Sequence, residues 1–408
     1  MKNRNFATFL LFSTVISSFS SCLANCEPIK EIGCNKTREY SNVGRYDLFE
    51  AITGVDEYNF RKNEEIIRKC IQKGDDGNFY IVNIKTGEKT CAGKFEEISI
   101  GEMDEELSKI KNYPGGGTFN VISLGKKYSD ASKKLRKKVD ISSLQANEEN
   151  KGKVFVVSSN FNALETLGNF DSVSSKTINS YIGDNTQGPY AAMSAMAGLI
   201  LRTYYIFYDK DKNPKDWRQT DENQVELLRD LNIKTQNGYV IENENQIYEK
   251  LTSKNARKNF KIGYHKDIQV SGGYFKDIFN QEFIKDKKQK IDQIYLAALN
   301  VYDFDINSEK AKKAAKKLLS FNYEATLKSA FLNGKKEVVI PLMGCNVFGN
   351  KPEWHVEAIK ENLDFIKKSG IKVTLNLVDK PAQSVFKKVC KDFKNLALQS
   401  VGEYTLFS

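Results

Sequence analysis

Two glycines in one loop could bring the backbone close to a phosphate. Gly344 and Gly349 lie in the stretch 338–350, which begins with three β-branched residues typical of a buried strand. An amphipathic helix is predicted to follow over 353–368. A strand, a glycine loop and a helix can aim free N–H groups at an anion, because glycine permits close approach and positive φ. An ordinary strand-to-helix turn would show the same pattern, so the anion site is one of two interpretations.

Two earlier loops carry polar side chains that suit a nucleotide. Asn160 and Asn162 follow a strand predicted at 153–158, and asparagine can both donate to and accept from ribose hydroxyls. A turn capped by its own asparagines is the alternative. Asp184 precedes a helix that we expect to begin at Pro189. The N–H groups of that helix start could hold a pyrophosphate, and Asp184 could orient a ribose hydroxyl or a water, unless it only caps the helix.

His265 and Asp267 could form an acid/base pair. They alternate along a predicted edge-like segment and would then point the same way, although a surface salt bridge is an equal alternative. The chain has only one other histidine, His355, and no pair of cysteines has zinc-finger spacing. We therefore expect neither a metal site nor a cofactor.

Strands and helices alternate along the second part of the chain, which predicts an α/β fold with a mixed sheet. The nearly all-apolar segment 291–301 is typical of a central strand, and Ser308 can cap a helix over 308–333. Further helices are predicted at 46–54, 63–72, 103–113, 126–138, 189–204, 221–231 and 244–252, and further strands at 79–84, 94–100, 118–124, 260–264, 268–270 and 371–378. We divide the mature chain into an N-terminal α+β extension, 25–115, and a main domain, 116–408.

The first 24 residues have the pattern of a secretory signal peptide. Lys2 and Arg4 precede an apolar run over 6–19, and cleavage after Ala24 is expected. Lipidation at Cys22 is the weaker alternative. The sequence shows no second hydrophobic span, so we expect a secreted or exported protein without a membrane span.

Charge and cysteine content narrow the class of protein further. The 62 basic and 52 acidic residues give a net charge of +10, but no Arg-rich run or aromatic-interleaved basic motif indicates nucleic acid. Most lysines should lie on solvated helix faces, and a basic surface would also attract a diphosphate. Export would allow disulfides Cys26–Cys34 and Cys70–Cys91, with other pairings open, whereas Cys345 and Cys390 are expected to be buried thiols.

Five motifs occur in an order that resembles the divergent, MavL-like macrodomain family of ADP-ribosylhydrolases. They are the stretches 161–165, 184–189, 237–239, 323–327 and 344–350, the last followed by Trp354. The resemblance covers about 46–378. It implies a macrodomain-like mixed sheet flanked by helices, binding of ADP-ribose, and removal of ADP-ribose from modified arginine of a protein, with ubiquitin as the attested kind of target. A secreted effector would be in keeping with the signal peptide.

The same resemblance implies roles for individual residues. The loops 160–165 and 184–189 would line the distal ribose, and 344–350 would wrap the diphosphate. We expect Asp184 to be the catalytic carboxylate, with Asp267 behind it. The ligand contacts would be Asn160, Asn162, Thr186, Gln187, Gly188, Gly344, Asn346, Val347, Phe348, Gly349 and Asn350.

The chain departs from the family pattern at several positions near these loops. Tyr190 stands where Ala or Cys is usual, Asn160 where Gln is usual, and neither Cys345 nor Asn346 is the usual Gly. A non-catalytic module that binds ADP-ribose is therefore the alternative function. An exported interaction protein that uses only the fold is a third hypothesis.

Overall fold

A computed structural model describes residues 41–124, 128–277, 280–305, 307–345 and 347–378, together with 391–392, 394–395 and 402–407. Residues 39–408 form one compact unit. The predicted signal peptide lies outside the described residues, as do Cys22, Cys26, Cys34 and Cys390.

The fold is mixed α/β, as predicted from the sequence. The strands are β1 (Ser41–Gly44), β2 (Ile71–Lys73), β3 (Phe79–Val82), β4 (Lys89–Ser99), β5 (Thr118–Leu124), β6 (Val154–Ser158), β7 (Thr235–Gln236), β8 (Tyr239–Val240), β9 (Lys261–Gln269), β10 (Gly272–Phe275), β11 (Asn280–Phe283), β12 (Lys290–Leu296), β13 (Glu337–Pro341), β14 (Lys372–Leu377) and β15 (Tyr404–Phe407).

Helices connect most of these strands. The α-helices are α1 (Leu48–Thr53), α2 (Glu57–Lys62), α3 (Glu64–Cys70), α4 (Ile100–Ser108), α5 (Lys133–Arg136), α6 (Ile141–Ala146), α7 (Gln187–Ser194), α8 (Met196–Tyr204), α9 (Glu244–Thr252), α10 (Ala256–Asn259), α11 (Glu309–Leu332) and α12 (Pro352–Ser369). The 3-10 helices are η2 (Arg45–Asp47), η3 (Tyr128–Asp130), η4 (Glu148–Asn150), η5 (Ile178–Gly183), η6 (Pro214–Trp217), η7 (Arg229–Leu231) and η8 (Val301–Asp303).

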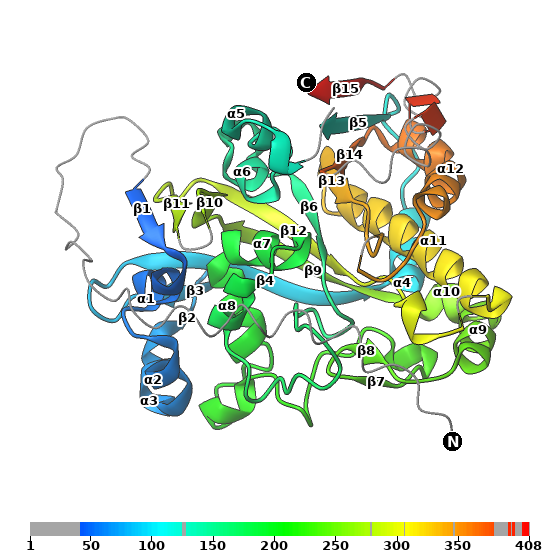
Figure 1. Ribbon diagram of the computed structural model, residues 1–408. Coiled ribbons are helices and arrows are strands. Elements are labelled where there is room, and N and C mark those ends of the chain that lie inside the picture. Colours follow the sequence, from blue (N-terminus) through cyan, green and yellow to red (C-terminus); the bar gives the residue numbers. More distant parts are fainter. Residues whose placement is uncertain are drawn as a thin grey trace. The chain divides into compact units, whose positions relative to one another are not determined.

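A large mixed sheet runs through the unit (Figure 1). The strand order is β15-β5-β14-β13-β6-β12-β9-β4-β3-β2. The strands from β15 to β12 run parallel to one another, and each later neighbour from β9 to β2 is antiparallel to the strand before it. Two small sheets accompany it, β1-β11-β10 and the hairpin β7-β8. The carboxyl ends of the parallel strands therefore all lie at the same end of the sheet, and in open α/β sheets ligands bind at this end.

Successive residues of β6 face opposite helical layers. Val154 and Val156 belong to the core that contains the apolar faces of α11 and α12, whereas Phe155 and Val157 belong to the core beneath α7. Helices α11 and α12 lie side by side on the face of the sheet to which Val154 and Val156 contribute (Figure 1). A strand covered on both faces needs an uninterrupted apolar run, which is why β6 and β12 are so hydrophobic in sequence.

The predicted central strand is confirmed. β12 pairs with β6 on one side and with β9 on the other, so it lies at no edge of the sheet. The strand ends at Leu296, and the residues after it form a loop. The helix predicted over 308–333 is α11, and Ser308 accepts a hydrogen bond from the Ala311 N–H at 3.2 Å, as a cap does.

Three predicted helices are wrong in part or in full because polar groups elsewhere take their backbone bonds. The helix predicted over 189–204 divides at Ala195, since the carbonyl of Ser194 accepts from the Ser271 N–H instead. Apart from the single turn of η7, the range 221–231 is not helical: its N–H groups bond to other segments, as at Val225, which donates to the Gln219 side chain. Of the basic range 126–138 the structure describes 128–138, and the only helical residues there are η3 and the four residues of α5.

The N-terminal section shares the main sheet. β4 pairs with β9 along six residue pairs, Lys94↔Lys266 to Ser99↔Lys261, and β3 and β2 continue from it. The disulfide considered between Cys70 and Cys91 is absent, since both are free buried thiols. The two sulfurs have different partners: that of Cys70 donates to the Thr53 carbonyl, and that of Cys91 to the Asp267 carbonyl.

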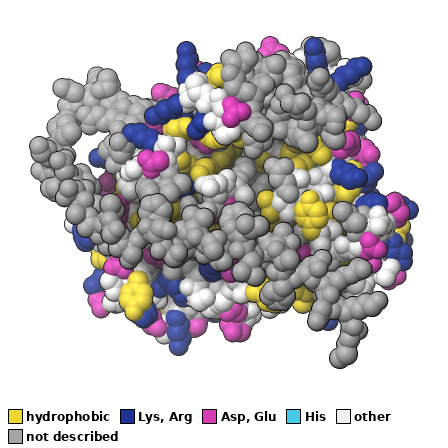
Figure 2. Space-filling view, in the orientation of Figure 1, with side chains coloured by type: hydrophobic (Ala, Val, Ile, Leu, Met, Phe, Trp, Pro, Cys, Tyr) yellow, Lys and Arg dark blue, Asp and Glu magenta, His cyan; other side chains and the backbone are white. Residues whose placement is uncertain are grey.

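Charged side chains of both signs are mixed on the face that Figure 2 shows. Several lysines pair with neighbouring acids, as Lys85 does with Glu50 at 2.7 Å. This agrees with the expectation of solvated faces. In the part of the chain that the structure describes, no helix is both long and apolar enough to cross a membrane.

Candidate functional site

Three neighbouring parallel strands end at the same edge of the sheet. β13, β6 and β12 are adjacent, and the loops 342–351, 159–166 and 297–304 follow them. The β7–β8 hairpin reaches the same place, because the Tyr239 hydroxyl donates to the Thr166 carbonyl at 2.6 Å. Segments far apart in the sequence are thus brought together by strand order alone.

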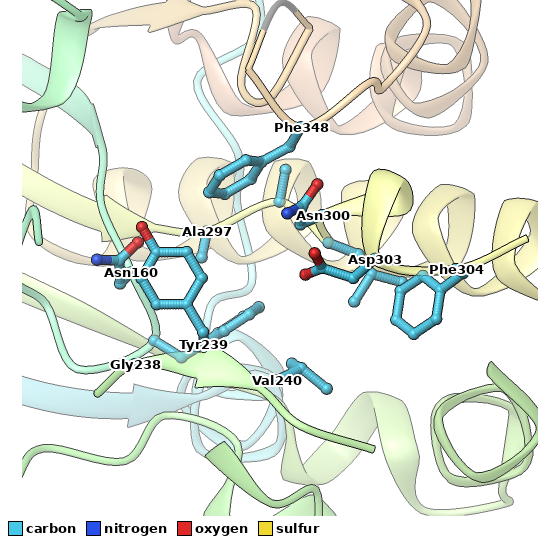
Figure 3. Close-up of a pocket in the computed structure, with 12 residues that line it drawn as sticks. Asn160, Gly238, Tyr239, Val240, Ala297, Asn300, Asp303, Phe304 and Phe348 are labelled. Atoms are coloured by element: carbon cyan, nitrogen blue, oxygen red, sulfur yellow. The ribbon is translucent and has the colours of Figure 1, made fainter. Parts of the chain in front are cut away.

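These loops surround a pocket (Figure 3). It contains about 290 Å³ of space, counting its open mouth. The lining residues are Asn160, Phe161, Gly238, Tyr239, Val240, Ala297, Ala298, Leu299, Asn300, Asp303, Phe304 and Phe348. The rings of Tyr239 and Phe348 have centroids 6.0 Å apart, and both lie around a common space with Asn300 and Asp303. Aromatic walls with a few polar groups suit a base or a sugar.

The loop between β13 and α12 turns at its two glycines. The φ angles of Gly344 and Gly349 are 68° and 69°. The Gly344 carbonyl accepts from the N–H groups of Phe348 and Asn350, at 3.2 and 3.0 Å. Among the described residues, the N–H groups of Gly344, Val347 and Gly349 meet no acceptor. They could donate to an anion, and the anion site predicted for this loop stays a prediction.

Packing explains why both positions require glycine. A Cβ on Gly344 would lie 2.6 Å from the Ala298 Cβ. A Cβ on Gly349 would lie 2.8 Å from side-chain atoms of Val301 and Tyr302. The sequence argument assigned the glycines to close approach of a ligand, whereas the structure shows close approach of the loop after β12. Asn350 strengthens this contact, since its amide donates to the Leu299 carbonyl at 2.8 Å. Asn346 lies outside the described residues.

His355 holds the glycine loop to the helices. It is buried in α12, and its Nε2 lies 3.1 Å from the Met343 carbonyl, which can only accept. Its Nδ1 lies 2.9 Å from the Tyr323 hydroxyl, which therefore donates to it. Burial lowers the pKa of His355 to about 4, so the ring is neutral at physiological pH. The histidine fixes the loop and does not face the pocket.

The start of α7 lies beside the end of β6. The helix begins at Gln187, two residues before the predicted start at Pro189. The Gln187 side chain accepts from the Ser158 N–H at 2.9 Å and donates to the Val156 carbonyl at 2.9 Å, so it is bound to the strand. Asp184 Oδ1 accepts from the N–H of Thr186 at 2.8 Å. Asp184 thus shapes the turn into α7 through one of its two carboxyl oxygens.

Gly188 lets α7 approach the strand end. A Cβ at this position would lie 1.9 Å from the Ser158 carbonyl oxygen. Gly188 and Gln187 therefore contact the protein, while Thr186, whose side chain caps nothing, is exposed. Of the predicted α7 ligands, only the exposed Thr186 and Asp184 have groups that a ligand could reach from solvent.

The two asparagines after β6 mainly hold their own loop. Asn162 accepts from the Leu164 N–H and donates to Gln224, both within the protein, and it does not line the pocket. Asn160 donates to Thr166 but does line the pocket. The self-capping interpretation therefore holds for Asn162, and Asn160 combines it with a place in the site.

Asp267 is not brought to this pocket. β9 is antiparallel to β12, so Asp267 lies beside the first residues of β12, at the opposite end of the strand from the loop that lines the pocket. It is exposed with φ 56°, whereas His265 is fully buried and bonds to the Ala92 carbonyl at 2.7 Å. A bulge separates the two, so they do not point the same way as predicted. Glu324 also lies apart, in ion pairs with Arg257 and Lys328.

Of the pocket residues, the sequence argument named only Asn160 and Phe348 as ligand contacts, and the titratable residues that it missed are Tyr239 and Asp303. Desolvation in the pocket raises the pKa of the Asp303 carboxyl. Burial raises the pKa of Tyr239, and the charges of Asp171, Asp184 and Asp303 raise it further. Asp171 is paired with Lys176 at 3.2 Å, but within the described chain neither Asp184 nor Asp303 has an ion-pair partner. Two carboxyl groups without an ion-pair partner in the described chain, Asp184 and Asp303, thus lie near enough to Tyr239 to influence its pKa.

No group of three or more metal-ligating side chains occurs within the residues that the structure describes. No protein-family model matches the sequence, and no curated protein sequence matches it.

Solved structures of poly(ADP-ribose) glycohydrolases are similar to this chain. One is the enzyme from Thermomonospora curvata, at TM-score 0.39 and 12% identity, covering 85% of this chain and 98% of that one. Another is the enzyme from Deinococcus radiodurans in complex with ADP-ribose, at TM-score 0.36 and 12% identity, covering 75% of this chain and 95% of that one. TM-scores this low support no inference about this chain's fold or activity, which therefore rest on its own residues.

Proposed function

We propose that this protein is an ADP-ribosylhydrolase that releases ADP-ribose from modified arginine of a protein, with ubiquitin as the first target to test. The observation that carries the proposal is the meeting of three features at one sheet edge: the pocket, the free N–H groups of the glycine loop, and the α7 turn with Asp184. An aromatic pocket, an anion site and a carboxylate are the groups that a nucleotide-sugar hydrolase needs.

The ligand is proposed to extend across this edge. The adenine lies in the pocket against Tyr239 and Phe348, whose rings pack edge-to-face on one another, with Asp303 as an acceptor for its amino group. The diphosphate takes the free N–H groups of the loop after β13. The distal ribose then lies towards Asn160 and Asp184, with its C1″ atom near the Asp184 carboxyl, which has no ion-pair partner within the described chain.

The reaction is a hydrolysis of the bond between C1″ and the arginine nitrogen. Asp184 accepts a proton from water as the water oxygen bonds to C1″, and the C1″–N electron pair leaves with the guanidine. Developing positive charge on the ribose is stabilised by the same carboxylate. The proton then passes to solvent. The products are ADP-ribose and the protein with its arginine residue unmodified. Two unneutralised carboxylates also suit the cationic guanidinium of the substrate.

A release assay tests the proposal directly. ADP-ribosyl-arginine ubiquitin is incubated with the protein, and free ADP-ribose is measured over time. We expect release by the wild type and none by Asp184→Ala, with ADP-ribose titrated calorimetrically into both. Binding without release would instead establish the non-catalytic module, and neither binding nor release would leave the interaction protein. Glu324→Gln is a matched control, because that carboxylate lies in an ion-pair network away from the pocket.

We also propose that the protein is exported. The basis is the sequence of residues 1–24, with two cations before an apolar run and small residues after it. Expression with the native N-terminus, followed by N-terminal sequencing, should show a chain that begins at Asn25.

A further inference from the structure

Glu165 is a buried carboxyl group without a hydrogen-bond partner. It lies in the loop after β6, and its side chain is 1% exposed. Within the described chain, neither of its carboxyl oxygens has a hydrogen-bond partner. A carboxylate in such a place is strongly destabilised, because burial removes its water and nothing replaces it. Its charge state therefore decides whether the surrounding loop is stable as observed.

The nearest cation only partly compensates this group. Arg202 Nη2 lies 3.6 Å from Glu165 Oε1, which is beyond hydrogen-bond distance, and both groups are buried. The remainder of the guanidinium is used elsewhere: Nε donates to the Ala163 carbonyl at 2.9 Å, and Nη1 donates to the Tyr295 hydroxyl. Arg202 thus holds the loop and the sheet together and leaves Glu165 without a direct donor.

Glu165 lies beneath the first turn of α7. A Cβ on Gly188 would come 3.3 Å from the Glu165 Cγ. The Glu165 N–H donates to the Tyr181 hydroxyl oxygen at 3.0 Å, which ties it to η5 just before the Asp184 turn. The groups that face the carboxyl are therefore Arg202 from α8, Tyr181 from η5 and Asp184 from the turn.

Burial raises the pKa of Glu165 to about 8; Arg202 and the Tyr181 hydroxyl oppose this shift, and Asp184 adds to it. At neutral pH the group thus carries a proton. The region beneath the helix start then holds one negative charge, that of Asp184, and not two.

We propose that Glu165 is a positioning residue of the ligand site, acting as a neutral carboxylic acid that keeps the charge beneath α7 low enough for an anionic ligand to bind there. The inference rests on the proposed function, because it takes ADP-ribose as the anion. It assigns Glu165 no contact with the ligand; the residue acts through the charge and the position of the α7 turn.

Proton linkage follows from this role. An ionised Glu165 repels the diphosphate, so bound ligand favours the protonated form and raises its pKa. If the shift is about one unit, affinity above both pKa values is about tenfold lower than below them. In the intervening range, binding of ADP-ribose takes up a fraction of a proton from solution. A purely structural carboxyl would show no such uptake.

The experiment is a calorimetric titration of ADP-ribose into the full mature chain at about pH 6.5, 8 and 9.5, each in two buffers of different ionisation enthalpy. For the wild type we expect proton uptake near pH 8 and about tenfold weaker binding at the highest pH. Glu165→Gln keeps the shape and stays neutral, so its affinity should not change with pH and no proton should be taken up.

Glu57→Gln is the matched control. Glu57 is also a buried carboxyl, but its oxygens have partners: they accept from the N–H groups of Ile178 and Asn179 at the start of η5 and from the Tyr204 hydroxyl. This variant should keep the wild-type dependence on pH.

Three results would overturn the inference. One is a Glu165→Gln variant that retains the alkaline loss of affinity and the proton uptake. A second needs no variant: the infrared spectrum of the wild type shows no protonated-carboxyl band that is lost on titration through about pH 8. The third is a wild type that binds no ADP-ribose at any pH, which removes the proposed function as well and is thus distinguishable from the first two.

Discussion

Protonation of His355 should destabilise the protein in mild acid. The pKa of the folded-state ring is lowered from 6.5 to about 4 by burial, and in the unfolded chain it returns to its ordinary value. The stabilising contribution is therefore fully present above the unfolded pKa, and it is lost as pH falls through the folded one. The lowered pKa corresponds to about 3 kcal/mol of stability in full. Linkage gives a loss of about 1 kcal/mol at about pH 5.5 and most of the contribution by about pH 4.

A variant isolates this contribution from the other groups that titrate in the same range. His355→Gln cannot be protonated, so the difference in unfolding free energy between wild type and variant should shrink by these amounts on acidification. Urea unfolding at several pH values measures it. His265→Gln is the control variant. His265 is a second buried histidine whose pKa is lowered, but it lies in β9 and does not contact the glycine loop.

The loop provides a second readout of the same change. Because the Met343 carbonyl accepts from His355 at 3.1 Å, the variant should also bind ADP-ribose more weakly at neutral pH. If the difference in unfolding free energy between wild type and His355→Gln stays constant between about pH 7.5 and 4, the neutral buried histidine is refuted.

Three further substitutions test the site. Asp184→Asn keeps the oxygen that accepts from the Thr186 N–H, so it should lower turnover by about two to four orders of magnitude, while the melting temperature changes little and the ADP-ribose affinity does not fall. Gly349→Val should lower the melting temperature as well as the affinity, because its Cβ would lie 2.8 Å from Tyr302, and pairing it with Tyr302→Ala should restore part of the loss. Tyr239→Phe should cost about 1 kcal/mol of stability through the lost bond to the loop after β6, with ADP-ribose binding retained by the ring.

Local signals in the sequence predicted most elements of the fold. Ser308 marked the start of α11, and Gly54, in the left-handed conformation, ends α1 where the sequence placed the end. The apolar run at 291–301 indicated a strand covered on both faces, which β12 is. Caps, glycines and apolar periodicity act within a few residues, so a single sequence contains them.

The errors occurred where distant groups replace local bonds. Nothing near Ser194 indicates that its carbonyl accepts from Ser271, so the break between α7 and α8 could not be read from the sequence. The same holds for Asp267, whose distance from the pocket follows from the antiparallel direction of β9. Strand direction depends on which strands become neighbours, and no local pattern records it.

The sequence named the loops of the candidate site and two of the residues that line its pocket, Asn160 and Phe348, but not the other residues of the pocket walls. Gly344, Gly349 and the Asp184 turn lie at strand ends and a helix start, which carry their own signatures. Tyr239 and Asp303 belong to a two-stranded hairpin and a short 3-10 helix that look like ordinary surface turns. They become pocket residues only because β13, β6 and β12 are neighbours.

The distribution of charge favours arginine among the possible linkages. The chain as a whole carries +10, yet Asp184 and Asp303 stand beside Tyr239 with no cation paired to them in the described structure. A diphosphate alone would be repelled by these carboxylates, and the free N–H groups of the glycine loop carry only partial charges. A guanidinium on the far side of the ribose neutralises one carboxylate and makes the whole substrate less negative. Serine or carboxylate linkages bring no such cation, so under the proposed function the binding of an arginine-linked substrate should weaken as salt is added.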